Sequence, residues 1–213
     1  MKSYLTVAGE GESLFEEKHS KFLTHVKPVR SAKEASAFIE AQKSRFWDAK
    51  HHVYAYRLQD GTQRFSDDGE PQGTAGMPTL DVLQKQNVTD LCLVTTRYFG
   101  GILLGAGGLV RAYSHSAALG LSAAGIVEMV PCTQALFFCD YSFYGRVPAL
   151  IAKWNGTLSE TDFTGKVKVS FQLPKQNVPG FTEEITALSA GRIQITETGT
   201  SYQAVPVEEN SSL

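Results

Sequence analysis

The order of strand and helix patterns after Cys132 is the feature that most restricts the fold of this chain. Strands are expected over residues 133–140, 157–163, 166–173 and 192–205, and helices over residues 143–154 and 177–188. Gly156 and Gly191 follow the two helices, where glycine commonly ends a helix. This β-α-β-β-α-β order within about 75 residues predicts a ferredoxin-like domain.

The first 130 residues predict a second α+β domain with a different order of elements. Strands are expected over residues 4–7, 13–15, 21–29, 52–58 and 90–99, with helices after Ser31, over residues 75–87 and over residues 109–124. Ser31 and Glu34 have the spacing of a capping box. The chain is therefore predicted to hold domains at residues 1–130 and 131–206, followed by a loose tail at residues 207–213.

Composition is that of an ordinary globular protein, with 42% hydrophobic and 20% charged residues among 213. No apolar run approaches the about 20 residues of a membrane-spanning helix, and the first residues lack a signal-peptide core. Cys92, Cys132 and Cys139 form no C-x₂-C pair, so buried thiols in a reducing compartment are expected. We therefore predict a cytoplasmic protein without a membrane partner.

Charge is nearly balanced, with a formal net charge of −2. This balance argues against a protein that coats nucleic acid by bulk electrostatics. Locally, the segment from Lys18 to Lys33 contains five lysines and arginines, two histidines and no acid, whereas four glutamates stand just before it. The segment predicts a mild basic stripe.

Residues 66–78 read S-D-D-G-E-P-Q-G-T-A-G-M-P, an unusual density of glycine, proline and carboxylates. One interpretation is an ordered binding loop in which Asp67, Asp68 and Glu70 meet a metal, a basic group or a substrate. The other is a tightly knit loop in which the two aspartates cap their own backbone and Glu70 pairs with an arginine. Residue types slightly favour the second interpretation and leave both open.

Residues 96–113 read T-R-Y-F-G-G-I-L-L-G-A-G-G-L-V-R-A-Y, a strand that ends near Arg97 and runs through glycines into a helix. Free amides and the dipole at a helix start favour an anion, and two arginines could add bidentate phosphate contacts. The candidate phosphate-binding residues are Arg97, Gly100, Gly101, Gly105, Gly107, Gly108 and Arg111. The supporting residues are Asp67, Asp68, Glu70 and His52.

The same glycines have a structural alternative, a close approach of helix to sheet that only glycine permits. The segment lacks the Gly-Lys-Ser/Thr of a Walker A loop and the G-x-G-x-x-G of a dinucleotide site. His51 and His52 fall on opposite faces of a strand, and no nucleophile elbow occurs. No catalytic residue, metal or cofactor is therefore assigned, and the carboxylates of residues 67–70 are expected near Arg97 or Arg111.

Four segments together resemble the IMPACT/YigZ family. They are K-H-S-K-F-L at residues 18–23, A-K-H-H-V-Y-A-Y-R at residues 49–57, and the two segments at residues 66–78 and 96–113. The resemblance covers about residues 1–125, and the second half is similar to the small domain of bacterial members. It implies an N-terminal domain like domain 2 of ribosomal protein S-five and a ferredoxin-like domain like one of elongation factor G.

The resemblance also implies a role in translation. Eukaryotic relatives compete for a ribosome-associated scaffold that activates an initiation-factor kinase, and they use an added N-terminal domain for which we expect no room here. We therefore expect a regulator of translation that binds RNA, the ribosome or a translation factor. Two alternatives stay open, an enzyme acting on a small phosphorylated substrate and a protein–protein adaptor that uses the ferredoxin-like sheet. Tyr54, Tyr56 and Tyr98 could stack on bases if exposed, whereas Phe99 is expected in the core.

Overall fold

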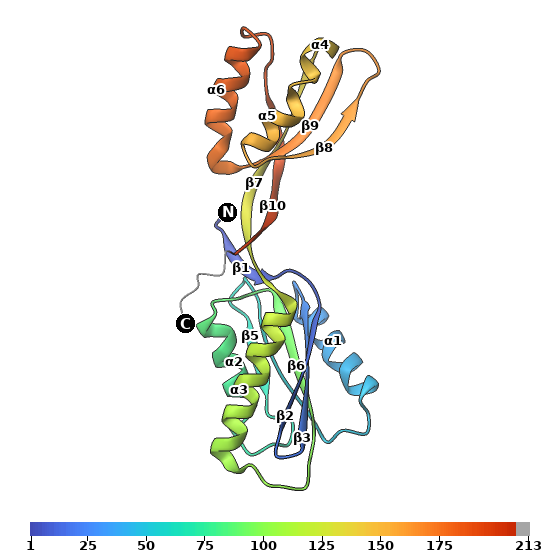
Figure 1. The fold of residues 1–213 in the computed structure, drawn as a ribbon, viewed down its shortest axis with the longest axis vertical. Coiled ribbons are helices and arrows are strands. Elements are labelled where there is room, and N and C mark those ends of the chain that lie inside the picture. The colour runs from blue at the N-terminus through green and yellow to red at the C-terminus, as the bar shows by residue number, and fades with distance from the viewer. Residues whose placement is uncertain (208–213) are drawn as a thin grey trace. The chain divides into compact units, whose positions relative to one another are not determined.

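In the computed structural model, which describes residues 1–207, the chain divides into two units within strand β7 (Ile126–Cys139). The N-terminal unit contains residues 4–128, and the C-terminal unit contains residues 129–205 with the first three residues. Figure 1 shows that both units combine helices with a sheet. The predicted α+β class with two domains is confirmed. The predicted loose tail lies outside the described residues, apart from Val207.

A five-stranded antiparallel sheet forms the centre of the N-terminal unit, in the order β2-β3-β6-β4-β5. Its strands are β2 (Gly11–Glu17), β3 (Ser20–Pro28), β4 (His51–Arg57), β5 (Gln63–Ser66) and β6 (Leu91–Tyr98). The central strand β6 is buried along almost its whole length, which explains its apolar sequence. Strand β5 was not predicted, because its largely exposed residues carry no alternating pattern.

Helices cover both faces of this sheet. Helix α1 (Ala32–Arg45) packs Phe38 and Ile39 against one face, and α2 (Gly76–Lys85) and α3 (Gly105–Ala124) pack against the other (Figure 1). Ser31 caps α1 as predicted, because its Oγ accepts the Glu34 N–H at 3.2 Å. Within residues 1–207, no helix has the length and hydrophobicity needed to span a membrane.

Helix α3 lies unusually close to strand β3. A Cβ atom at Gly120 would stand 2.5 Å from Thr24 Cγ2 and 3.1 Å from Val26 Cγ2, too close for any residue except glycine. The close approach of helix to sheet expected from the glycines of this region is therefore found at Gly120, within the helix rather than at its start.

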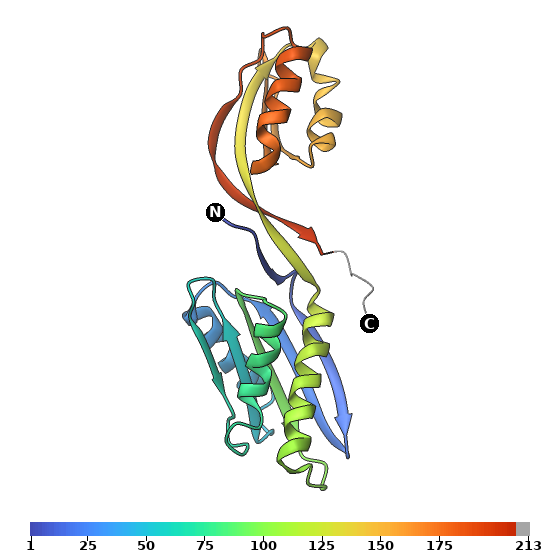
Figure 2. The same ribbon diagram turned by 90° about the vertical axis from the view of Figure 1, so that its left-hand side faces the viewer.

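The C-terminal unit has the strand order β10-β7-β9-β8, with β8 (Thr157–Asp162), β9 (Val167–Pro174) and β10 (Thr196–Pro206). Strand β1 (Tyr4–Val7), which belongs to the N-terminal unit, also pairs with β7. Figure 2 shows α5 (Val147–Lys153) and α6 (Val178–Leu188) on the same side of this sheet. This arrangement is ferredoxin-like, as predicted, and the short helix η1 (Lys175–Asn177) leads into α6.

Three predicted boundaries in this unit were wrong. Strand β7, expected over residues 133–140, begins at Ile126. The helix expected over residues 143–154 is split into α4 (Tyr141–Tyr144) and α5. Pro148 explains the break, because proline donates no N–H and its ring clashes with the carbonyl four residues earlier, so it is tolerated only in a first turn. The last strand begins at Thr196 rather than at Arg192.

The predicted burial of the cysteines is confirmed. Cys92, Cys132 and Cys139 are buried, free thiols. Burial raises the pKa of each thiol above its ordinary value, so all three stay protonated at neutral pH. Cys92 and Cys139 act as small apolar groups in the two cores.

Two glycines of α3 provide a matched test of its packing. Gly120→Ala should lower the free energy of unfolding by about 1–3 kcal/mol, because its methyl group would overlap Thr24. Gly107→Ala should raise it by up to about 1 kcal/mol, because that position is open and alanine favours a helix. Urea denaturation of both variants measures the difference, and equal effects would contradict the close packing of α3 on β3.

Candidate functional site

The four segments that carry the sequence motifs meet at one end of the N-terminal sheet. Residues 18–23 form the β2–β3 turn and the start of β3, and residues 49–57 lead into β4. Residues 66–78 join β5 to α2, and residues 96–113 join β6 to α3. The pairing register places both Phe22 and His51 opposite Arg97, so these segments lie at the same end of the sheet. Figure 2 shows the three connecting loops together at that end.

A buried ion pair lies at the centre of this end. Arg97 Nη1 donates to Glu70 Oε1 at 2.7 Å, and the two side chains are 6% and 4% exposed. Tyr113 donates its hydroxyl proton to the same Glu70 oxygen at 2.8 Å. Burial and the Glu70 carboxylate raise the pKa of Tyr113 well above its ordinary value, so the phenol remains a donor. The prediction that a carboxylate of residues 67–70 lies near Arg97 or Arg111 is confirmed.

Ser20 connects this pair to the glycine-rich segment. Its buried Oγ accepts from Arg97 Nη2 and from the Gly100 N–H, each at 3.2 Å. A Cβ atom at Gly100 would lie 2.0 Å from the carbonyl carbon of His19, so only glycine fits there. Lys18 and His19 both have positive φ, as expected for a two-residue hairpin turn. The β2–β3 turn is thereby fixed against the loop that precedes α3.

The two aspartates of the β5–α2 loop bind backbone amides. The Asp67 carboxylate accepts the N–H groups of Gly73, Ala75 and Gly76 at 2.8–3.0 Å, which caps the start of α2. Asp68 Oδ2 accepts the His52 N–H at 2.7 Å. The interpretation of residues 66–78 as a tightly knit loop therefore agrees with this geometry.

His52, expected as a supporting residue of the site, is held by the surrounding loops. Its ring is buried, and Nε2 lies 3.1 Å from the Phe46 carbonyl oxygen. The neighbouring His51 places Nδ1 2.9 Å from the Asp68 carbonyl oxygen. Both histidines thus tie the start of β4 to adjacent loops. Among the described residues, no group of three or more His, Cys, Asp or Glu is arranged to hold a metal ion.

The assignment of Arg97 as a phosphate ligand does not agree with the structure. Both terminal nitrogens donate to protein groups, and the guanidinium carbon lies 5.4 Å from the Phe22 ring centroid and 5.7 Å from that of Phe99. Gly100 likewise serves packing rather than ligand binding. Phe99, expected in the core, is 54% exposed because β6 ends at Tyr98.

The remaining candidate glycines lie at the start of α3, which begins at Gly105 rather than at Leu109. Gly101 and Gly105 have φ values of +86° and +70°, which glycine adopts without strain. Gly107 and Gly108 therefore belong to the helix and not to a loop. The N-cap residue Leu104 makes no side-chain cap hydrogen bond, and no side chain within residues 1–207 accepts from the first amides of α3.

Arg111 is exposed and reaches back to this first turn. Its Nη1 would lie 3.8 Å from a Cβ atom placed on Gly107. Lys18, Arg111 and His115 line one groove of about 460 Å³, which we call the α3 groove. Its other lining residues are Phe15, Glu17, Leu104, Gly108 and Ala112. Sequence reasoning had assigned Arg111 but had not placed Lys18 or His115 beside it.

An exposed apolar tip adjoins the groove through the chain itself. Phe99, Ile102 and Leu103 precede α3, and Leu103 is 83% exposed. The sequence signal of this tip is its run of apolar residues between Gly101 and Gly105.

The predicted basic stripe is neutralised in part, because two of its lysines pair with glutamates. Lys21 lies 3.7 Å from Glu16, and Lys27 lies 2.7 Å from Glu10. The antiparallel pairing of β2 with β3 places the glutamates of one strand beside the lysines of the other. Lys18, in the turn, remains to line the α3 groove.

Removal of one member of the buried pair should destabilise the N-terminal unit strongly. Arg97→Ala leaves the Glu70 carboxylate buried without its cation, which should lower the free energy of unfolding by about 3–5 kcal/mol. Hydrogen exchange of β6 peptides measures this loss, with β9 peptides as the internal reference. Lys21→Ala, which removes an exposed ion pair, is the matched control and should change stability by at most about 1 kcal/mol. Similar values for the two variants would contradict a structural role for the pair.

Tyr113→Phe tests the third member of this network. The variant keeps the ring, whose centroid lies 5.2 Å from that of Phe22, and loses only the donor to Glu70. Loss of one hydrogen bond to a buried carboxylate should cost about 1.5–3 kcal/mol, less than Arg97→Ala. The same exchange measurement applies, and an unchanged stability would show that Glu70 does not need this donor.

This chain is similar to known proteins along almost its whole length. The Impact N-terminal domain model matches residues 18–121, and a domain of unknown function, DUF1949, matches residues 137–192. The IMPACT family member YvyE of Bacillus subtilis is 38% identical over 206 residues, covering 95% of this chain and 94% of that protein. YigZ of Escherichia coli, another IMPACT family member, is 34% identical, covering 92% and 98%.

More distant relatives match part of the chain. The human protein IMPACT is 32% identical over 94 residues, which are 42% of this chain and 29% of that protein. A crystal structure described as that of a hypothetical protein has a TM-score of 0.59 and 32% identity, covering 93% of this chain and 98% of its own. Full-length similarity to the bacterial proteins, together with both domain matches, shows that this chain belongs to the IMPACT family.

Proposed function

We propose that this protein is a cytoplasmic regulator of translation that binds RNA, on the ribosome, through the α3 groove. The observation that carries this proposal is the convergence of three anion-favouring features. The guanidinium of Arg111 and the ammonium of Lys18 line the groove beside Gly108, in the first turn of α3. Uncapped amides and the positive end of the helix dipole lie at the same place. An RNA phosphate satisfies all three together.

Hydrogen bonds fix the segments that lead into the groove, which supports a binding role. Ser20 and Gly100 fix the β2–β3 turn, and the pair of Arg97 with Glu70 fixes the β5–α2 loop against α3 through Tyr113. A preorganised groove loses little conformational entropy when it binds a partner. The buried motif residues therefore support the exposed ones.

The apolar tip supports a ribosomal target. Exposed Phe99, Ile102 and Leu103 offer contact area that bare phosphates do not use. Ribosomes present protein and RNA side by side, so a cationic groove next to an apolar tip suits such a surface. Membership of the IMPACT family supports the same direction, because the family resemblance implies a role in translation.

The enzyme alternative receives no support from this geometry. It assigned a base or metal-binding role to Asp67, Asp68 and Glu70. Each of these carboxylates accepts hydrogen bonds from the protein itself. Their arrangement explains the order of the loop rather than a reaction.

Substitution of the groove cations should weaken binding without unfolding the protein. Arg111→Ala and Lys18→Ala should each reduce co-sedimentation with ribosomes and affinity for a single-stranded RNA. Each should also lower the slope of log affinity against log salt by up to about one unit, because one phosphate contact is lost. Lys85→Ala, an exposed lysine in the last turn of α2, is the matched control.

The outcomes separate the parts of this proposal. If the unmodified protein bound neither ribosomes nor RNA, the proposed function in translation would be contradicted. Normal RNA binding by Arg111→Ala would exclude the α3 groove as its site. Leu103→Ser should weaken ribosome binding and leave the salt slope unchanged, because it removes an apolar contact.

A further inference from the structure

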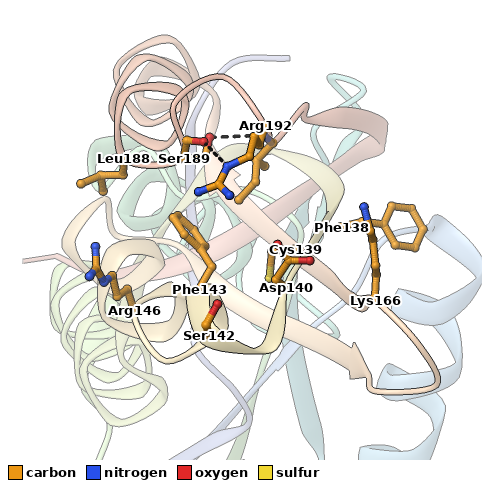
Figure 3. A pocket seen from close by; sticks show the side chains of 11 residues that line it. Phe138, Cys139, Asp140, Ser142, Phe143, Arg146, Lys166, Leu188, Ser189 and Arg192 are labelled. Atoms are coloured by element: carbon orange, nitrogen blue, oxygen red, sulfur yellow. Dashed lines mark hydrogen bonds between the residues drawn. The ribbon is translucent and has the colours of Figure 1, made fainter.

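A second hollow lies within the C-terminal unit and is separate from the α3 groove. Its volume is about 460 Å³. Four segments surround it: the end of β7, the α4–α5 connection, the turn before β9 and the end of α6 (Figure 3). Arg146, Lys166 and Arg192 line it together with one carboxylate, Asp140. The charged groups of the hollow therefore favour an anion.

These three cations lack ion-pair partners within residues 1–207. Lys153 of the same unit, in contrast, is paired with Glu184 at 2.7 Å. Asp140 lies on the same hollow, yet it makes no ion pair with any of the three. Like charges gathered around one hollow repel one another, and an anion between them converts that repulsion into attraction.

Arg192 is held in position by its own segment. Its Nε donates to the Ser189 carbonyl oxygen at 3.0 Å, and the buried Ser189 hydroxyl accepts the Ile193 N–H at 3.2 Å. Figure 3 shows both bonds as dashed lines that start at Ser189. Among the described residues, no protein group accepts from its two terminal nitrogens. A guanidinium fixed at Nε and free at both Nη groups is suited to bidentate phosphate binding.

The hollow also has an apolar side. Phe143 is half-buried, Ile193 is buried, and Leu188 is partly exposed at the end of α6. The volume lies within the range of about 300–1,000 Å³ for small-molecule sites. An aromatic ring gives a flat ligand a surface for stacking. Asp140 adds an acceptor for a hydroxyl or amino group.

We propose that this hollow binds a phosphorylated small molecule of nucleotide size. Its phosphates contact Arg146, Lys166 and Arg192, and its ring lies against Phe143. The same chemistry is available from a free nucleotide and from the terminal nucleotide of an RNA chain. This inference does not depend on the α3 groove, because all of its residues belong to the C-terminal unit.

Titration calorimetry of the full chain tests the proposal with four probes: ATP, GTP, inorganic phosphate, and a short RNA with a 5′-triphosphate. At least one nucleoside triphosphate should bind saturably, with inorganic phosphate as a weak competitor. Arg192→Gln and Lys166→Gln should each weaken that binding roughly tenfold, the loss of one charge-assisted contact. Lys175→Gln removes an exposed lysine of the same unit outside the hollow and is the matched control. Melting temperatures show whether each variant is folded.

Each outcome decides for or against the hollow. If the triphosphate RNA binds more tightly than the same RNA with a 5′-hydroxyl, the ligand of the hollow is an RNA end. If the two RNAs bind equally and ATP or GTP binds saturably, the ligand is a free nucleotide. Absence of saturable triphosphate binding by the folded chain would overturn the proposal. It would also be overturned if Lys175→Gln lost as much affinity as Arg192→Gln, or if Arg111→Ala abolished the binding, which would move it to the α3 groove. Weaker nucleotide binding by Phe143→Leu, with unchanged inorganic phosphate binding, would support the position of the ring.

Discussion

The buried pair of Arg97 and Glu70 is the interaction on which the motif end of the N-terminal unit depends. Two charges removed from water are tolerated only when each compensates the other and further hydrogen bonds satisfy them. Tyr113 supplies such a bond to the carboxylate, and Ser20 supplies one to the guanidinium. Through these contacts one ion pair joins strands β3 and β6, helix α3 and the β5–α2 loop. The loop can therefore be rich in glycine and still hold one conformation.

This dependence separates two kinds of motif residue. Those at the centre, such as Arg97 and Gly100, are restricted because of what they touch inside the protein. Those at the rim, such as Arg111 and Leu103, touch little and remain available to a partner. A family motif that mixes both kinds therefore marks a supported surface, and only its exposed members are candidates for binding.

The fold could be predicted from the sequence more completely than the site. The elements of the fold depend on local sequence patterns, whereas the site depends on contacts between residues that are distant in sequence. Alternation, helix periodicity and glycine stops are local, so the ferredoxin-like order could be predicted. Strand β5 was missed because pairing with β4, rather than its own pattern, makes it a strand. The burial of Arg97 depends on Glu70 and Ser20, which are 27 and 77 positions away, and no local pattern reports such contacts. Phe99 was expected in the core because it is apolar, like most residues of the buried strand that it follows.

Whether a lysine or arginine has a carboxylate partner matters more for anion binding than how many of them a segment contains. The stripe from Lys18 to Lys33 looked basic in sequence, yet the antiparallel register of β2 and β3 places glutamates beside two of its lysines, Lys21 and Lys27. The hollow of the C-terminal unit has fewer cations than this stripe. They come from segments far apart in sequence, so no basic stretch of the sequence predicts the hollow. Since a paired lysine has already exchanged water for a carboxylate, an added phosphate gains less there than at an unpaired one. Anion binding is therefore expected where the fold gathers cations without their partners, in the α3 groove and in the hollow beside Arg192.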